Sequence, residues 1–236
     1  MMVGFEVFNE QGYKIAGNDL PNLCFYGKGR VNVPREGLPR PMAPGGVMNF
    51  YRSQYPLIEI AGRLYLSAGS GTKGSAGWVD YWSFGPVSPP DTVTSHGLEI
   101  YSTEGALTFN TARPFLKLLG RTAIVRDHYE VITNQGWRSY LDFTEPLGFQ
   151  GGSLAFAIGN TRVYWTSQQF VDPRRGQVFT DAYRFVRGMH IDTAGRFASA
   201  TLNTAVTRYS GSTGNFNYSP NGTAPLTMLV ADVSGL

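Results

Sequence analysis

The chain repeats its opening segment once, and this repeat constrains the fold more than any other feature of the sequence. Residues 4–12 read GFEVFNEQG, and residues 97–105, which lie 93 positions later, read GLEIYSTEG. The match continues without a gap as far as Gly27 and Gly120. A repeat of this length exceeds the roughly 20–50 residues of solenoid repeats, so it indicates a duplicated small domain.

Both copies alternate apolar and polar residues and then reach a glycine, which predicts a strand that runs into a turn. In the second copy we expect Leu98 and Ile100 to face the core and Glu99 to face solvent. The residues on either side of Glu6 take the corresponding places in the first copy. We expect the two copies to superpose on these opening strands.

Two later segments extend the repeat if gaps are allowed. Residues 57–67 resemble residues 156–166, and both segments read as hairpins that turn at a glycine. Residues 80–85 resemble residues 181–188, and both read as aromatic strands. These matches predict that the copies share more than their first strand.

The expected fold class is all-β, with two tandem β-sandwich-like domains related by duplication and long loops rich in proline and glycine. The chain has 29 glycines and 14 prolines, its aromatic content is 14%, and no window keeps a helical period. We place the N-terminal domain at residues 1–90 and the C-terminal domain at residues 91–236. The second domain carries an extension from about residue 190 that has no counterpart in the first.

Cysteine use and hydropathy indicate a protein that folds without disulfides. The single cysteine, Cys24, lies in an expected strand at residues 23–26 and cannot form an intramolecular disulfide. We expect a buried thiol there and not a nucleophile. The opening residues lack a signal-peptide pattern, and no stretch of about 18 apolar residues exists to span a membrane. These patterns predict synthesis in the cytoplasm and no membrane insertion.

The charge pattern argues against nucleic-acid binding. The formal net charge is +3, and the basic residues are spread along the chain without a dense run. Arginine strongly outnumbers lysine. Arginine is favoured at protein interfaces because its planar fork binds carboxylates and stacks on aromatic rings, although codon usage in a GC-rich genome explains the excess equally well.

Residues 28–56 are predicted to form a long interface loop. They contain five prolines, and proline is excluded from the middle of a sheet. Long loops in compact domains are usually functional or packed against a partner. We expect this loop to contact another subunit, so the chain is predicted to be a homo-oligomer. The candidate interface residues are Arg30, Arg35, Arg40, Phe50, Tyr51, Arg52 and Tyr55.

Residues 209–223 are the best candidate for a recognition loop. Small polar residues alternate there with aromatic ones, as in adaptable binding loops. The alternative is a plain surface loop whose aromatic side chains pack down onto the domain. The candidate ligand- or receptor-binding residues are Tyr209, Asn215, Phe216, Asn217 and Tyr218.

No catalytic or metal-binding pattern stands out. The three histidines have no metal-ligand spacing with another histidine, cysteine or carboxylate, and no nucleophile elbow precedes a helix. A carboxylate pair of the glycosidase type cannot be read from sequence. The recurrence of Glu6 and Glu99 fits a structural strand position better than catalysis. We predict no catalytic residue, no metal and no cofactor.

The repeated motif resembles the opening of small tail-associated virion proteins of tailed bacteriophages. The motif reads Gly, Phe or Leu, Glu, Val or Ile, Phe or Tyr, three further residues and Gly, and a short apolar strand ending in Gly follows it. The aromatic strand around Tyr183 and Phe185 is similar to a later strand of that family. One such unit often makes most of a chain in the family, whereas here it looks doubled. The resemblance implies a structural or host-recognition role and brings no catalytic residues.

The expected function is therefore that of a non-enzymatic structural protein of a phage tail, in its tip, fibre or baseplate. Such a protein acts in assembly, with attachment to a host surface as a further role. Its expected partners are other tail proteins, further copies of itself and a glycan or protein of the host surface. Its expected location is the virion, after synthesis in the host cytoplasm. The alternative function is a carbohydrate-binding or carbohydrate-cleaving module.

Overall fold

The computed structural model consists of strands, turns and irregular segments, and the part of the chain that it describes contains no helix. All strand pairs are antiparallel. The all-β prediction is confirmed. The described residues are 6–8, 14–17, 22–68, 74–87, 98–124, 143–146, 149, 153–159, 162–192, 195–211, 217–218 and 226–236.

The first of the two large sheets has the same plan when it is followed inward from either edge. β3, β8 and β5 follow one another from one edge, and β11, β18 and β13 follow from the other. β5 and β13 meet in the middle, where Tyr51 pairs with Phe156. The six strands, in sheet order, are β11 (Lys117–Ile124), β18 (Leu226–Asp232), β13 (Leu154–Ile158), β5 (Met48–Ser53), β8 (Gly77–Pro86) and β3 (Leu23–Val33).

The second, eight-stranded sheet follows a similar plan. β4, β7 and β6 follow one another from one edge, and β12, β16 and β15 follow from the other. β6 and β15 meet where Leu57 pairs with Met189. The main path, in order, is β12 (Phe143–Pro146), β16 (Arg196–Ser210), β15 (Val178–Ile191), β6 (Leu57–Ile60), β7 (Arg63–Leu66) and β4 (Leu38–Pro39), with β14 (Arg162–Val171) beside β15 and β17 (Asn217–Tyr218) beside β14.

The strands of the two sheets therefore fall into two sets with the same pairing order. We call β3, β4, β5, β6, β7 and β8 the first unit, and β11, β12, β13, β15, β16 and β18 the second unit. The units join edge to edge in both sheets, so the predicted domains 1–90 and 91–236 share two sheets. The boundary near residue 90 stays a prediction, and residues 88–97 lie outside the described residues.

Two small hairpins precede the two units, and their registers agree. In the hairpin of β1 (Glu6–Phe8) and β2 (Lys14–Gly17), Glu6 pairs with Gly17. In the hairpin of β9 (Glu99–Tyr101) and β10 (Leu107–Asn110), Glu99 pairs with Asn110. Each hairpin has its register shift between its second and third pair. Every paired position in one hairpin lies 93 residues from its counterpart in the other, which is the offset of the sequence repeat.

The strands that follow the hairpins carry the same irregularity. β3 shifts its register against β8 between Phe25 and Gly27. β11 shifts its register against β18 between Leu118 and Gly120, at the same offset of 93 residues. A β-bulge bends a strand and increases its local twist. The repeated sequence therefore specifies a hairpin and a bulged strand at both places.

In the second hairpin, the repeated glutamate forms hydrogen bonds within the hairpin. The Glu99 carboxylate accepts hydrogen bonds from Asn110 Nδ2 at 2.9 Å and from the Tyr101 hydroxyl at 2.6 Å. Glu99 is exposed and Ile100 is buried, as the alternation predicts. Leu98 is 45% exposed, so its predicted core position is wrong, because the residue precedes the strand.

Each face of the six-stranded sheet carries a cluster of apolar side chains. We call the cluster between the two large sheets the inner core; it contains Tyr51, Leu57, Leu64, Phe156 and Met189, with other side chains of both sheets. We call the cluster on the opposite face of the six-stranded sheet the outer core, and it is built around Phe50, Trp82, Phe84, Ala155, Ala157, Ala231 and Val233. The sheet also curls until its edges meet, because Cys24 forms a bridge to Phe115, just before β11.

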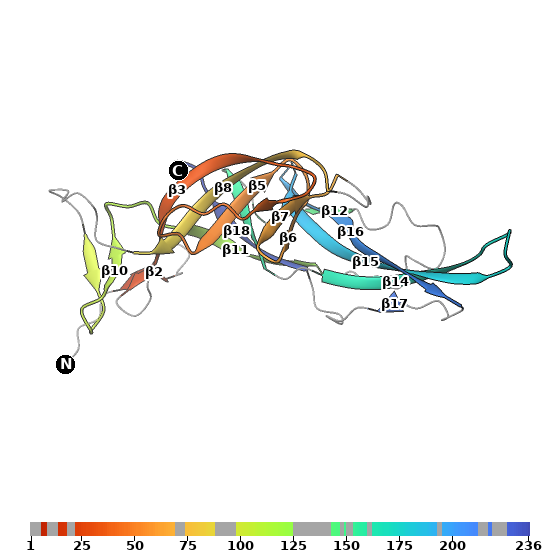
Figure 1. Cartoon of the computed structure of the whole chain (residues 1–236). Helices are drawn as coiled ribbons and strands as arrows, with labels where there is room; N and C mark the ends of the chain where they lie inside the picture. The colour runs from red at the N-terminus through yellow and green to blue at the C-terminus, as the bar shows by residue number, and fades with distance from the viewer. Residues whose placement is uncertain are drawn as a thin grey trace.

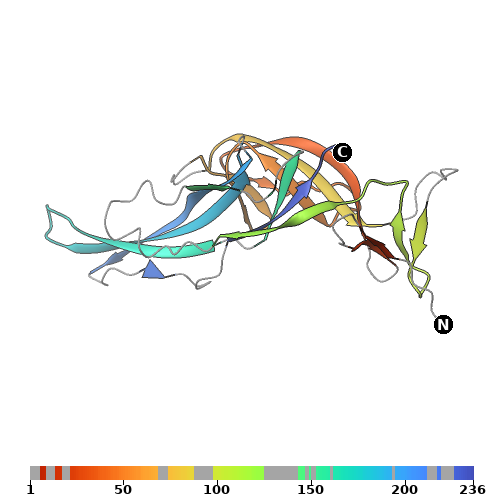
Figure 2. The ribbon, with the colours of Figure 1, turned by 180° about the vertical axis from the view of Figure 1, so that it is seen from behind.

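The molecule is elongated, with the hairpins at one end and a narrow arm at the other (Figures 1 and 2). We call β14, β15, β16 and β17 the arm. β15 has 14 residues and β16 has 15, so both strands reach well beyond the body of their sheet. β14 pairs with β15 along its whole length, from Arg162 to Val171.

The structure corrects three expectations about the chain's organisation. Residues 28–56 are not one long loop, because they contain the second half of β3, all of β4 and all of β5. Residues 156–166 do not form a hairpin, because β13 and β14 belong to different sheets. Residues 80–85 and 181–188 also lie in different sheets.

Residues beyond about 190 are not an appended extension. They supply β16 and β18, whose partners correspond to those of β7 and β8 in the first unit. The predictions about the repeat relied on short matches between strands, and short strands of similar composition do not reveal their partners.

Candidate functional site: a basic and aromatic surface on the first unit

The predicted interface residues separate into core and surface groups. Phe50 is 0% exposed and Tyr51 is 2% exposed, so the prediction that they form an intermolecular interface is wrong. β5 is an inner strand of its sheet, and its two faces contribute to the outer and the inner core. Arg35 and Arg40 are exposed, and Tyr55 is half-buried. Arg40 forms an ion pair with Glu59 at 3.3 Å.

Arg30 and Arg52 lie together on one sheet face, which we call the basic grid. The grid continues the face of the outer core toward the start of β8, and its residues are cross-strand neighbours in three rows. The rows are Lys28, Trp82 and Phe50; Arg30, Asp80 and Arg52; and Asn32, Trp78 and Gln54.

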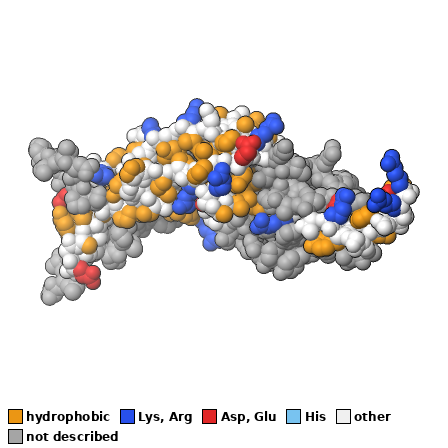
Figure 3. Space-filling view, in the orientation of Figure 1, with side chains coloured by type: hydrophobic (Ala, Val, Ile, Leu, Met, Phe, Trp, Pro, Cys, Tyr) orange, Lys and Arg blue, Asp and Glu red, His pale blue; other side chains and the backbone are white. Residues whose placement is uncertain are grey.

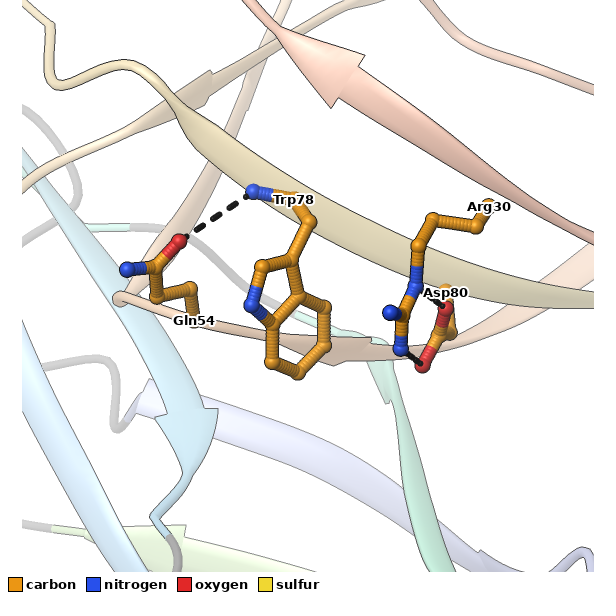
Figure 4. A network of polar contacts seen from close by, with 4 residues as sticks. All are labelled: Arg30, Gln54, Trp78 and Asp80. Atoms are coloured by element: carbon orange, nitrogen blue, oxygen red, sulfur yellow. Dashed lines mark hydrogen bonds and ion pairs between the residues drawn. The ribbon is translucent and has the colours of Figure 1, made fainter.

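Figure 4 shows Trp78 between Gln54 on one side and the ion pair of Arg30 with Asp80 on the other. The Arg30 guanidinium donates to both oxygens of Asp80, at 2.6 and 2.9 Å, which is the bidentate geometry that arginine favours. The guanidinium also lies over the Trp78 ring, 4.6 Å from its centroid. Gln54 Oε1 accepts a hydrogen bond from the Trp78 backbone nitrogen at 3.4 Å. Three strands therefore hold this surface together.

Arg52 occupies the other side of Asp80. Its guanidinium lies 5.6 Å from the centroid of the Trp82 ring and donates to the Ser153 hydroxyl. Trp82 is 7% exposed, and its buried Nε1 has no hydrogen-bond partner within the described residues. The first row of the grid therefore contains an unsatisfied polar group, and a buried donor without a partner is costly.

The apolar end of the same face is covered and the grid is open. Leu116, Val233 and Leu236 pack into the outer core, and Lys28 Nζ donates to the Leu236 carbonyl oxygen at 2.5 Å. Beyond this cover, Arg30 exposes 61% of its side chain. Over β3, β8 and β5, basic side chains stand among hydrophobic ones and acidic ones are few (Figure 3). The grid can therefore meet an external molecule.

Three of the five predicted recognition residues lie in the arm. Tyr209 is 45% exposed near the end of β16. Asn217 and Tyr218 form β17, which pairs with Thr166 and Trp165 of β14. Asn215 and Phe216 lie outside the described residues. The recognition role of residues 209–223 stays a prediction.

The arm carries an arrangement that resembles part of the basic grid. Arg208 donates to both oxygens of Asp181, at 2.7 and 2.9 Å, across β15 and β16. Its guanidinium lies 5.8 Å from the centroid of the Phe179 ring. The arm therefore repeats the arginine, carboxylate and aromatic combination, but with phenylalanine in place of tryptophan.

Two buried titratable groups lie away from the grid. Burial lowers the pKa of His190, although the Ser53 carbonyl and Asp192 act in the opposite direction. His190 Nδ1 lies 3.2 Å from the Ser53 oxygen, and since a carbonyl only accepts, Nδ1 carries the hydrogen. Burial raises the pKa of the Cys24 thiol, and its expected burial is confirmed.

Sequence reasoning missed Trp78, Asp80 and Trp82 as a site. The signal was present, because the three residues alternate along one strand and therefore share a face. Their partners could not be read from sequence, because Arg30 and Asp80 are 50 residues apart.

Among the described residues, no group of three or more His, Cys, Asp or Glu side chains is placed to hold a metal ion. Within the same residues, no helix could cross a membrane.

Comparisons of the chain with protein-family models, with curated proteins and with solved structures found no match. The residues, their contacts and the sequence resemblance are therefore the basis for any functional proposal.

Proposed function

We propose that the chain is a non-enzymatic structural protein of a bacteriophage tail, in its tip, fibre or baseplate. In this role it joins neighbouring tail proteins during assembly and contributes to attachment at the host surface. The observation that carries the proposal is the motif-bearing hairpin. It is the element on which the resemblance to tail-associated virion proteins depends, and it occurs twice with the same register and the same shift.

We further propose that the two units descend from one duplicated unit. The support is the shared pairing order in both large sheets and the common offset of 93 residues in the hairpins and in the bulged strands. Equivalent strands pair with each other where the units join, as in a two-fold dimer. A fused dimer of this kind gives an assembly protein a rigid body with elements projecting from both ends.

The hairpin end is the proposed contact with neighbouring tail proteins. Leu98 and Tyr101 on or next to β9, and Leu118 and Leu119 on β11, are between 41% and 51% exposed. Large apolar side chains that a monomer leaves exposed can mark an interface. These residues replace Phe50 and Tyr51 as interface candidates.

Excision of the second hairpin tests the assembly role. Residues 98–111 can be replaced by a short glycine and serine linker, because Thr111 N donates to the Leu98 oxygen at 3.0 Å and the ends therefore lie close together. In a phage that carries this variant gene, we expect the protein to fold but to be missing from purified particles. Mass spectrometry of the particles measures its incorporation.

The matched control inserts the same linker at the tip of the arm, in the turn at residues 172–176. We expect this variant to be incorporated. Complete particles that never contain the wild-type protein would reject the proposed function. Normal incorporation of the hairpin variant would place the assembly contact elsewhere and reject the proposed role of the hairpin.

A further inference from the structure

The basic grid belongs to the first unit alone. The register places Arg121 and Leu229 of the second unit where the first unit has Lys28 and Trp82. At the next row, Ala123 and Thr227 stand where Arg30 and Asp80 form their ion pair. Among the described residues, a sheet with the same pairing order is therefore built without two of the three cations and without the tryptophan at the place of Trp82, so the fold does not require the grid.

The difference between the two units extends to the neighbouring strand of each. In the first unit, Phe50 and Arg52 of β5 face Trp82 and Asp80. In the second unit, Ala157 of β13 faces Leu229, and Gly159 donates its backbone nitrogen to the Thr227 oxygen at 2.9 Å. A surface that one unit has and its topological counterpart lacks is a candidate for a function specific to that unit.

The charges of the grid select an anionic ligand. Lys28, Arg30 and Arg52 are cationic, and Asp80 is the only acidic residue in the grid. Asp80 is engaged by the fork of Arg30. Within the described residues, Arg52 has a hydroxyl partner and no salt bridge. A carboxylate that approaches the row of Asp80 therefore meets a guanidinium that can form a paired, charge-assisted hydrogen bond.

The aromatic and amide residues select the rest of the ligand. Trp78 and Trp82 lie four positions apart on β8, which is about 13 Å at the rise of a strand. Asn32 and Gln54 flank Trp78 and are exposed. Indole rings offer apolar faces, and side-chain amides both donate and accept hydrogen bonds. A chain of sugar rings has this combination of apolar ring faces and hydroxyl groups over a comparable length.

We propose that the basic grid binds an acidic saccharide, with a sugar ring against Trp78 and a sugar carboxylate at Arg52. Arg52 covers the Trp82 ring, so its movement toward the carboxylate uncovers that indole. The proposal goes beyond a place in a phage tail and does not depend on it, because the binding belongs to the isolated chain.

Binding of a short oligogalacturonate to the purified full-length chain tests the proposal. The neutral control ligand is its methyl ester, which has the same ring backbone without the charge. We expect saturable binding of the acid, with a change in tryptophan fluorescence, and affinity for the ester lower by about tenfold or more. Calorimetry at physiological ionic strength gives both affinities.

Variants identify the site. We expect Arg52→Gln and Trp78→Ala each to lower affinity for the acid by about tenfold or more, because each removes one good contact. The matched control is Arg208→Gln, which disrupts the similar arrangement on the arm, and we expect it to bind like wild type. Melting temperatures of all three variants show whether the fold is kept.

Any of these results would overturn the proposal: no binding of the acid, equal binding of the acid and its ester, equal loss in the arm variant, or unchanged affinity in both grid variants. Equal binding of an acidic polypeptide such as polyglutamate would also overturn it, in favour of a protein partner. If Trp78→Ala does not fold, Arg52→Gln decides alone, because Arg52 is at the surface of the grid and its counterpart in the second unit is a glycine.

Discussion

The two units pair their strands in the same order but place different residues on the outer face of the six-stranded sheet. The first unit has a tryptophan there, and an aspartate with an arginine on either side of it. The second unit has leucine, threonine, alanine and glycine at the matching positions. The inner face differs much less, because both units contribute large apolar residues to one inner core. Pairing and inner packing therefore specify the fold, and the outer face is free to vary.

The two units also differ in side-chain burial at positions where their backbones are alike. Phe25 and Leu118 occupy the same place before the bulge of their strands. Phe25 packs against the outer core, with its ring 5.9 Å from that of Phe84, whereas Leu118 is 51% exposed. The repeat thus fixes the backbone at both places and not the environment of the side chain.

The largest expected effect tests whether the units form one cooperative body. Phe156 is fully buried in the inner core at the junction, next to Tyr51 of the other unit. We expect Phe156→Ala to lower the free energy of unfolding by about 3–5 kcal/mol and to leave a single transition in urea. The control Val171→Ala, at a 59% exposed position, should change it by less than about 0.5 kcal/mol. Two separate transitions would mean that the units are independent.

The pair of Phe25 and Leu118 tests the difference between the outer faces. We expect Phe25→Ala to cost about 2 kcal/mol of unfolding free energy, because the partly buried ring loses contact with the outer core. Leu118→Ala should change the same quantity by less than about 0.5 kcal/mol. Similar losses in urea unfolding would show that Leu118 is covered in solution, for example by a second copy of the chain.

The similarity of the backbones can be tested at two glycines. Gly62 and Gly195 each precede the first residue of the equivalent strands β7 and β16, with φ of 74° and 72°. No atom lies within 4 Å of an added Cβ at either position. We therefore expect alanine to cost about 1–2 kcal/mol at each, from the left-handed backbone alone. Asparagine tolerates this conformation better and should recover part of the loss at both sites, whereas unequal losses would contradict the equivalence.

The smallest expected effect concerns pH. The pKa of His190 is lowered by burial, so below about pH 6.5 the unfolded chain binds a proton more readily than the folded chain. The free energy of unfolding should therefore fall as the pH is lowered through this value. His190→Gln should flatten the profile between about pH 7.5 and 5. The lowered pKa of Asp232 affects the free energy of unfolding only below about pH 4. If the free energy of unfolding of the wild type does not change with pH above about pH 5, this role of His190 is contradicted.

The sequence predicted the local elements well. Glu99 marks the start of a strand in a hairpin, and Cys24 is buried in a strand, as expected. The error at residues 28–56 came from the prolines. Pro34 and Pro41 lie between strands, and Pro39 lies in the short edge strand β4, so none of them interrupts the middle of a sheet. The number of prolines predicted a loop, but it could not show where the chain crosses from one sheet to the other.

The sequence by itself determined an all-β chain with a repeated hairpin, because alternation and turn residues act over a few positions. Only the tertiary structure decided which strands are neighbours. It brought Arg30 to Asp80 and Arg52 to Ser153, across 50 and 101 residues. The physical reason is that backbone hydrogen bonds are alike in every antiparallel pair, so the choice of partner depends on packing between segments far apart in the chain.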